Sequence, residues 1–146
     1  NKPYIVMAYD SRVDKFSKVK QMFPGLTPRG TTPEGLCFEA IMKEFVPINN
    51  DLDSYFLNLS DGQPYFPGQN FYYGGATAET HTNKMVKMIE SMGIQTLAYF
   101  VTDWEIDVES SDARSFKRMY GKGAKMIDVK NVNQITKTMN QLFLQK

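Results

Sequence analysis

Apolar runs of strand length alternate along the chain with segments whose apolar residues recur at helical spacing. Four runs predict strands, at residues 4–9, 53–60, 93–102 and 124–129. These runs are mostly apolar, which is typical of strands in a parallel sheet that is covered on both faces. The pattern therefore favours an α/β protein.

The segments between and after these runs have apolar residues every three or four positions. They predict helices at residues 32–45, 78–92, 110–120 and 131–143. Thr32 and Pro33 suit a first helical turn, and Gly93 suits a C-terminal stop. Strands that alternate with helices predict a three-layer α/β/α, Rossmann-like fold with a mostly parallel sheet, in one domain over residues 1–146.

Ligands of such sheets bind beyond the carboxyl ends of the strands. Asp10, Asp61, Thr102 and Asp103 end or follow predicted strands, so we expect them at this edge. Asp61-Gly62 is also a hairpin signal. Pro64 would deprive a return strand of a backbone donor, which favours a turn at the strand end and leaves the hairpin as the alternative.

Composition excludes several classes of partner. The chain has 17 Lys and Arg against 16 Asp and Glu, a net charge of +1. This charge is too small to attract nucleic acid or an anionic membrane by the overall electrostatic field of the protein. The longest apolar run, at residues 97–101, is far shorter than the roughly 20 residues of a membrane span. Cys37 is the only cysteine, so no internal disulfide forms and a cytoplasmic setting is expected.

Two motifs and the strand pattern around them carry a resemblance to a known family. The chain has GTTPEG at residues 30–35, LSDGQP at 59–64, then a predicted helix and GIQTLAYFV at 93–101. It resembles the von Willebrand factor A domain, and is most similar to the A domains of cobalt-chelatase subunits of cobalamin biosynthesis and of phage chelatase-like proteins. The resemblance implies a metal-ion-dependent adhesion site with Asp61 and Thr32 as ligands, Thr31 being the alternative to Thr32.

The family's first strand ends in an Asp-x-Ser-x-Ser motif, and this sequence has no such triplet. Arg12 and Asp14 stand at the two serine positions after Asp10, and that segment lies too near Thr32. We therefore expect that the chain starts after the family's first strand and helix. Removal of a central strand would leave exposed sheet edges, which a partner protein or a second copy would fill.

Metal chemistry supports the two ligands independently of the resemblance. Mg²⁺ or Mn²⁺ prefers oxygen ligands and Mg²⁺ usually keeps several waters, so Asp61 and Thr32 can be part of its shell and a partner's carboxylate can complete it. With these two ligands alone the metal would be weakly held. Thr32 can also serve as a helix N-cap without any metal.

Three other residues are candidates for a metal-binding or catalytic role. His81 lies near a helix start without a second His or a Cys at ligand spacing, so we interpret it as a polar helix residue. Cys37 lies beside Leu36 on an apolar helix side, which favours a buried, inert thiol. Trp104 follows the third strand and belongs either to the rim of the site or to an ordinary loop.

An aromatic segment follows Asp61 directly, at residues 63–75. Its aromatic side chains are Tyr65, Phe66, Phe71, Tyr72 and Tyr73. On a loop at the functional edge they suit protein recognition, because each supplies a large contact area at small entropic cost. The alternative is that they cover the end of the sheet.

The resulting functional hypothesis is a non-enzymatic protein-interaction module of von Willebrand A type. By resemblance it would belong to a chelatase-like complex and couple an ATPase subunit to metal insertion. One rival is a small hydrolase with a metal held by Asp10, Asp61 and Asp103, which convergence of those carboxylates would favour. Another is a truncated fragment with an incomplete metal site.

Overall fold

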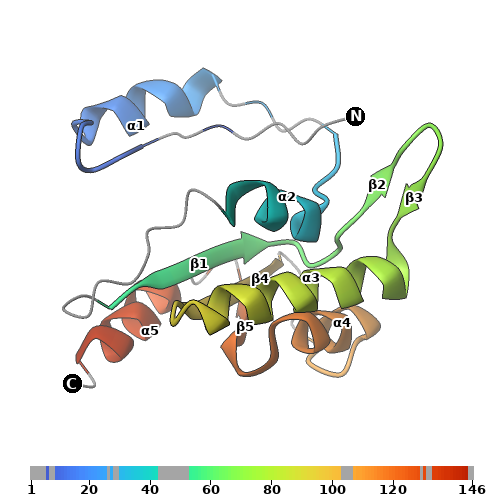
Figure 1. Cartoon of the computed structure of the whole chain (residues 1–146). Helices are drawn as coiled ribbons and strands as arrows, with labels where there is room; N and C mark the ends of the chain where they lie inside the picture. Colours follow the sequence, from blue (N-terminus) through green and yellow to red (C-terminus); the bar gives the residue numbers. More distant parts are fainter. Residues whose placement is uncertain are drawn as a thin grey trace.

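The structure is a computed structural model that describes residues 6, 9–25, 27, 30–42, 53–102, 107–128, 130 and 133–144. Figure 1 shows its elements. The helices are α1 (Ser17–Met22), α2 (Glu34–Ile41), α3 (Gly75–Ser91), α4 (Ser111–Tyr120) and α5 (Asn133–Leu144), with short 3-10 helices at Phe23–Gly25 and Gly121–Gly123. The strands are β1 (Tyr55–Ser60), β2 (Phe66–Pro67), β3 (Tyr72–Tyr73), β4 (Gln95–Thr102) and β5 (Ala124–Asp128).

The main sheet has three parallel strands in the order β1-β4-β5. In its register Tyr55 pairs with Gln95 and Ser60 with Phe100, and on the other side Thr102 pairs with Asp128. All three strands therefore end at one edge, and Asp61 lies there. The prediction of an α/β fold with a parallel sheet is confirmed.

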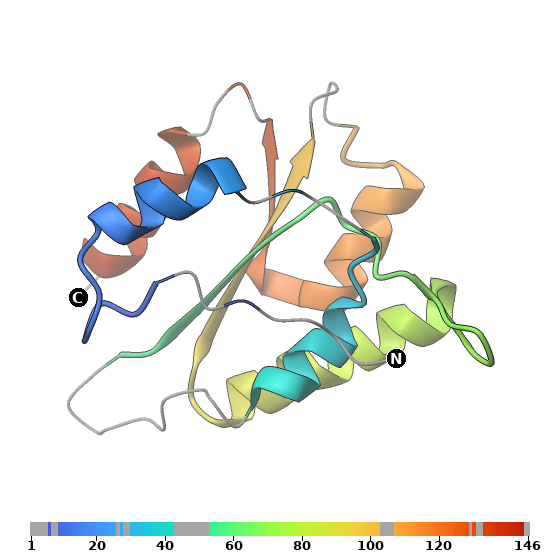
Figure 2. The same cartoon turned by 90° about the horizontal axis from the view of Figure 1, so that it is seen from above.

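One face of the sheet packs against α2, α3 and α4, and Figure 2 shows these helices on one side of the strands with α5 on the other. The core on this face is a cluster of buried side chains. Its members are Phe38, Met85, Val86, Ile89, Ile94, Ala98, Phe116, Met119 and Tyr120. Met85 and Ile89 follow the helical spacing that predicted α3, and Phe116 and Met119 the spacing that predicted α4.

The opposite face is covered less completely. Leu97, Tyr99 and Ile127 form a second buried cluster, and Ile135 of α5 packs against it. Leu57 and Leu59 of β1 point to the same face as Leu97 and Tyr99, because the pairs are in register. Their side chains remain 37% and 55% exposed.

The first predicted strand, residues 4–9, differs from the structure at the residues that are described. Val6 and Tyr9 lie outside any strand and are 47% and 38% exposed, while the rest of that range lies outside the described residues. An apolar run becomes a strand only where a neighbouring strand satisfies its backbone groups, and no strand of the described residues pairs with Val6 or Tyr9. The prediction was wrong at these two positions.

The aromatic segment predicted as a loop contains a short antiparallel hairpin. Phe66 pairs with Tyr73 and Pro67 with Tyr72, and the connection between them holds Gly68. Figure 1 shows this β2–β3 hairpin projecting away from the sheet beyond the end of β1. The segment is thus ordered by its own strand pairing rather than laid over the end of the sheet.

No helix among the described residues is long and apolar enough to cross a membrane.

Candidate functional site

A surface cavity of about 640 Å³ lies at the carboxyl end of β1. It brings together residues of the loop before α2, of α2 itself and of the ends of β1 and β4. Its lining residues are Thr32, Glu34, Cys37, Phe38, Asn58, Leu59, Ser60, Asp61 and Val101. Both metal ligands predicted from the sequence, Thr32 and Asp61, are among them.

Thr32 is exposed, and its backbone fixes the loop that carries it. Its carbonyl oxygen accepts from the Glu34 N–H at 3.0 Å and from the Tyr65 N–H at 3.3 Å. The alternative role of Thr32, as the N-cap of α2, is not observed, because Pro33 holds the N-cap position and no side chain makes a cap hydrogen bond there. Thr31, the alternative ligand, is exposed and does not line the cavity.

Asp61 lies on a turn at the strand end, which confirms the preference for such a turn over a hairpin at Asp61-Gly62. Gly62 has a φ of 96°, a conformation that favours glycine, and its N–H donates to the Ser60 hydroxyl at 2.9 Å. A Cβ on Gly62 would collide with the Phe100 ring. Asp61 is exposed and has no ion-pair partner in the described part of the chain.

Glu34 is a member of the cavity that the sequence reasoning missed. Its side chain is buried, with the residue 3% exposed, and each carboxylate oxygen accepts a hydrogen bond. Asn58 Nδ2 donates to Oε1 at 3.1 Å and the Tyr120 hydroxyl donates to Oε2 at 3.0 Å. Asn58 Nδ2 also donates to the Tyr120 hydroxyl at 2.8 Å, so one network joins α2, β1 and α4.

The only sequence signal for this network was an Asn inside an otherwise apolar strand. Asn58 is polar where β1 faces the core, and a buried amide needs a partner. The position of that partner, 24 residues earlier in the chain, follows only from the folded backbone.

Burial and the Glu34 carboxylate set the acidity of two neighbours. Burial raises the pKa of the Tyr120 hydroxyl far above its usual value, and the negative charge of Glu34 raises it further. The pKa of the Cys37 thiol is raised by the same two causes in the same order. Cys37 is half-buried and lines the cavity, so the prediction of a buried thiol was wrong, but a thiol with a raised pKa is a poor nucleophile at neutral pH.

The aromatic hairpin begins directly beside the cavity, because Tyr65 is bonded to Thr32. Tyr65 and Tyr72 form an edge-to-face pair at 5.7 Å, and Phe66 and Phe71 form a tilted pair at the same separation. Tyr72 is 68% exposed, and Phe71 and Tyr65 are also exposed. These side chains therefore present an aromatic surface on the hairpin, whose base at Tyr65 is bonded to the Thr32 loop.

Tyr73 departs from the prediction that all five aromatic residues form the partner-binding loop. It is 6% exposed, and its hydroxyl lies 3.0 Å from His81 Nδ1 of α3. A Cβ on Gly35 of α2 would meet both the Tyr73 hydroxyl and His81, so these elements approach closely. Tyr73 holds the hairpin to the body, because alternate residues of a strand point to opposite sides.

His81 lies within α3, beyond the helix start at which it was expected. Its Nε2 lies 3.6 Å from Glu39 Oε2 of α2, and its ring packs edge-to-face on Tyr73. It therefore contributes to the packing of α2, α3 and the hairpin.

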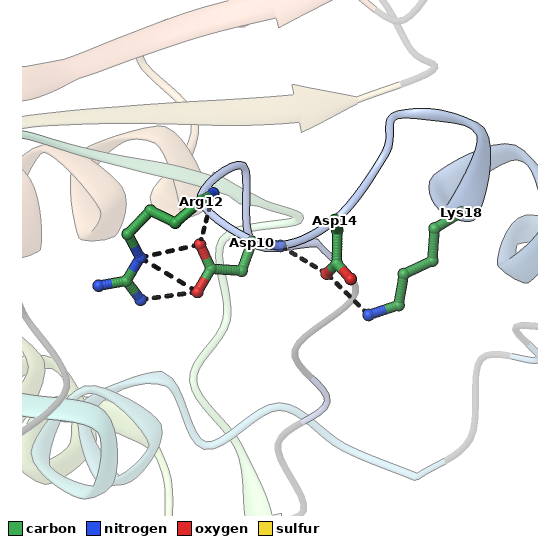
Figure 3. A network of polar contacts seen from close by, with 4 residues as sticks. All are labelled: Asp10, Arg12, Asp14 and Lys18. Atoms are coloured by element: carbon green, nitrogen blue, oxygen red, sulfur yellow. Dashed lines mark hydrogen bonds and ion pairs between the residues drawn. The ribbon is translucent and has the colours of Figure 1, made fainter.

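Of the carboxylates in the rival hydrolase hypothesis, Asp61 lines the cavity and Asp10 does not. Figure 3 shows Asp10 in the N-terminal segment, bound by Arg12 through Nε at 2.9 Å and Nη2 at 2.6 Å. These bonds lower the pKa of Asp10 to about 2. Asp14, in the same network, accepts from Lys18, and Asp10 does not line the cavity. Asp103 and Trp104 lie outside the described residues.

Apart from the Cys37 thiol, the cavity is lined mainly by oxygen donors, which fit Mg²⁺ or Mn²⁺ in type. Most of these oxygens are already engaged: those of Glu34 by Asn58 and Tyr120, and that of Ser60 by Gly62. Thr32 and Asp61, the two predicted ligands, are both exposed. Among the residues that the structure describes, no group of three or more His, Cys, Asp or Glu is placed to hold a metal ion.

The sequence matches no model of a known protein family, and no curated protein matches it.

Proposed function

We propose that this chain is a non-enzymatic protein-interaction module of von Willebrand A type, and that its sheet and helices form that family's three-layer arrangement. Parallel strands that end at one edge, with α2, α3 and α4 against one face and α5 against the other, support this proposal. The motif residues Thr32 and Asp61 lie at that edge, where the resemblance expects them.

One observation carries the proposal: the exposed aromatic hairpin and the Thr32–Asp61 cavity are joined. The bond from the Tyr65 N–H to the Thr32 carbonyl fixes the base of the hairpin against the loop that lines the cavity. Tyr65, Phe71 and Tyr72 expose aromatic surface on this hairpin, and aromatic residues are the type that most often anchors protein interfaces.

The proposed partner is a protein. In keeping with the resemblance to chelatase subunits, it would be an ATPase subunit or a protein whose carboxylate completes the coordination of a weakly held Mg²⁺ or Mn²⁺. Thr32 and Asp61 would supply the ligands of this chain. A self-associated form through an open sheet edge is part of the same proposal, and catalysis belongs to other chains.

A photo-crosslinking experiment tests the proposal in cells that express the protein. A benzophenone amino acid replaces Tyr72 in one variant and the exposed Lys87 of α3 in a control variant. We expect a discrete protein adduct from position 72 that unlabelled wild-type chain competes away, and no such adduct from position 87. The same adducts at both positions, or none that wild-type chain displaces, would contradict the proposal.

A further inference from the structure

The free edge of β1 has a defined set of backbone groups. The Gln95 N–H donates to the Ser54 carbonyl at 2.9 Å. In the parallel pairing of β1 with β4, this bond determines which residues of β1 direct their backbone groups toward β4 and which direct them away. Even-numbered residues of β1 then turn their N–H and C=O groups toward β4, and Leu57 and Leu59 turn theirs to the other edge. No strand of the described part of the chain pairs with that edge.

The cavity at the carboxyl end of β1 has lining residues from both faces of the sheet. Asn58 and Glu34 line it on the face that α2 covers, and Leu59 and Val101 line it on the opposite face. An extended segment laid beside β1 would place alternate side chains on these two faces. One set would meet the polar side of the cavity and the other set would meet exposed leucine.

The titratable side chains with a usual charge at neutral pH that line the cavity are acidic. Glu34 and Asp61 are among its lining residues, and none of those residues is Lys, Arg or His. The donors that reach Glu34 are the neutral Asn58 amide and Tyr120 hydroxyl, so its negative charge meets no cation among the described residues. A basic side chain is the complement of this surface.

We propose that an extended segment of a partner protein adds as a strand to the free edge of β1 beside residues 57–60. In the chain without a bound metal ion, its basic residues lie at the cavity that Glu34 and Asp61 line, in the place of that cation, and its apolar residues face Leu57 and Leu59. This inference rests on the proposed function, since it names the chemistry of a protein partner. Main-chain bonds supply the affinity and the alternating side chains supply the selectivity.

Three synthetic peptides test the selectivity. Each has the form acetyl-Gly-Val-X-Val-X-Val-Gly-amide and carries a fluorophore, with X as arginine, serine or glutamate. We expect anisotropy titrations to rank them arginine, serine, glutamate, with about a tenfold difference between the first and last. Equal affinity of the three peptides, or no binding of the arginine peptide, would overturn the proposal.

Backbone pairing is tested separately from charge. Leu59→Pro removes an N–H that faces the free edge and leaves the ladder to β4 intact, so it should abolish peptide binding while the circular dichroism spectrum is retained. The same test can be made on the wild-type protein with an arginine peptide whose alternate backbone amides, those that would face β1, are methylated. This peptide lacks the N–H groups that strand pairing needs, so it should not bind either. Retained binding in the methylated peptide excludes strand addition.

Charge is tested by Asp61→Asn, with Glu109→Gln as the matched removal of an exposed carboxylate elsewhere. The first should reduce the preference for arginine over serine, and the second should leave it unchanged. Equal effects of the two variants would contradict a local role for Asp61.

Two further measurements distinguish strand addition by a basic partner from the hairpin interface and from self-association. Tyr72→Ser should leave peptide binding intact. If the benzophenone at position 72 gives no specific adduct while the arginine peptide still binds, the hairpin interface alone is refuted. Sedimentation of the wild-type chain identifies the other occupant of the edge: a dimer that Leu59→Pro dissociates, with no arginine preference, would replace the basic partner by a second copy.

Discussion

At the end of β1, one residue decides where Asp61 lies. Gly62 combines a φ of 96° with close approach to the Phe100 ring, and its N–H closes the turn on Ser60. A side chain at this position would therefore disturb both the backbone and the packing that position Asp61 at the cavity.

Replacement of Gly62 by alanine should lower the free energy of unfolding by about 2–4 kcal/mol, because a left-handed conformation and a steric collision are combined. Gly75→Ala is the matched control, since Gly75 also has a positive φ, of 54°, but nothing within 4 Å of an added Cβ. We expect the control to cost about 1 kcal/mol. Urea unfolding of both variants measures the difference, and equal costs would refute the role of Phe100.

Metal binding by this chain would also depend on individual side chains, those of Thr32 and Asp61. Two protein ligands leave most of an octahedral shell to water, so this chain should bind Mg²⁺ and Mn²⁺ only weakly. Isothermal titration of the purified chain should show no micromolar binding for either ion, and Asp61→Asn should not change the result. Micromolar affinity that Asp61→Asn abolishes would show a more complete site than these two ligands form.

At the scale of elements, the β2–β3 hairpin has one anchored side and one exposed side. Tyr73 is buried against His81 of α3, whereas its neighbour Tyr72 is 68% exposed. Adjacent tyrosines thus have different roles, which strand alternation explains.

Tyr73→Ala should destabilise the protein by about 3–5 kcal/mol, the usual cost of truncating a buried aromatic side chain. Tyr73→Phe should cost about 1 kcal/mol, because the ring stays buried and only the hydroxyl contacts with His81 and with the Ala78 carbonyl are lost. Tyr72→Ala should stay within about 0.5 kcal/mol, as expected for an exposed position. Thermal unfolding of the three variants measures this order, and a large loss from Tyr72→Ala would mean that the exposed side also holds the hairpin.

At the scale of the whole molecule, the Glu34 network joins parts of the chain that are far apart in sequence. Glu34 and Tyr120 are separated by 86 positions, and Asn58 of β1 lies between them. The network therefore forms only when α2, β1 and α4 have assembled.

Its consequence is a dependence of stability on alkaline pH. Burial raises the pKa of Tyr120 in the folded state above the value of about 10 in the unfolded chain. The contribution is complete below pH 10 and is lost above it, because the unfolded chain alone then releases the proton. Above pH 10 this residue should lower the free energy of unfolding by about 1.4 kcal/mol per pH unit.

Tyr120→Phe should be less stable at pH 7 by about 1–3 kcal/mol, since the Glu34 carboxylate loses a buried donor. Its free energy of unfolding should fall less steeply above pH 10 than that of wild type. Denaturant unfolding between pH 8 and pH 11 measures the two slopes. Identical slopes would mean that Tyr120 ionises equally in both states.

The sequence was sufficient for features that depend on local pattern. Continuous apolar runs and helical spacing located β4, β5, α3 and α4, and the prolines after Gly62 indicated a turn rather than a return strand. The same reasoning was wrong for Val6 and Tyr9, because apolar character does not provide a neighbouring strand. It also left open a capping role for Thr32, and Pro33 holds that position instead.

By itself, then, the sequence determined the α/β class, the parallel sheet and the presence of Asp61 at its carboxyl edge, because hydrophobic periodicity reports burial along one chain segment at a time. Only the tertiary structure decided that Thr32 and Asp61 share a cavity, that Glu34 is buried between Asn58 and Tyr120, and that Tyr73 is an anchor while Tyr72 is exposed. These are relations between segments distant along the chain. Packing fixes them, and no local pattern encodes the distance between two such segments.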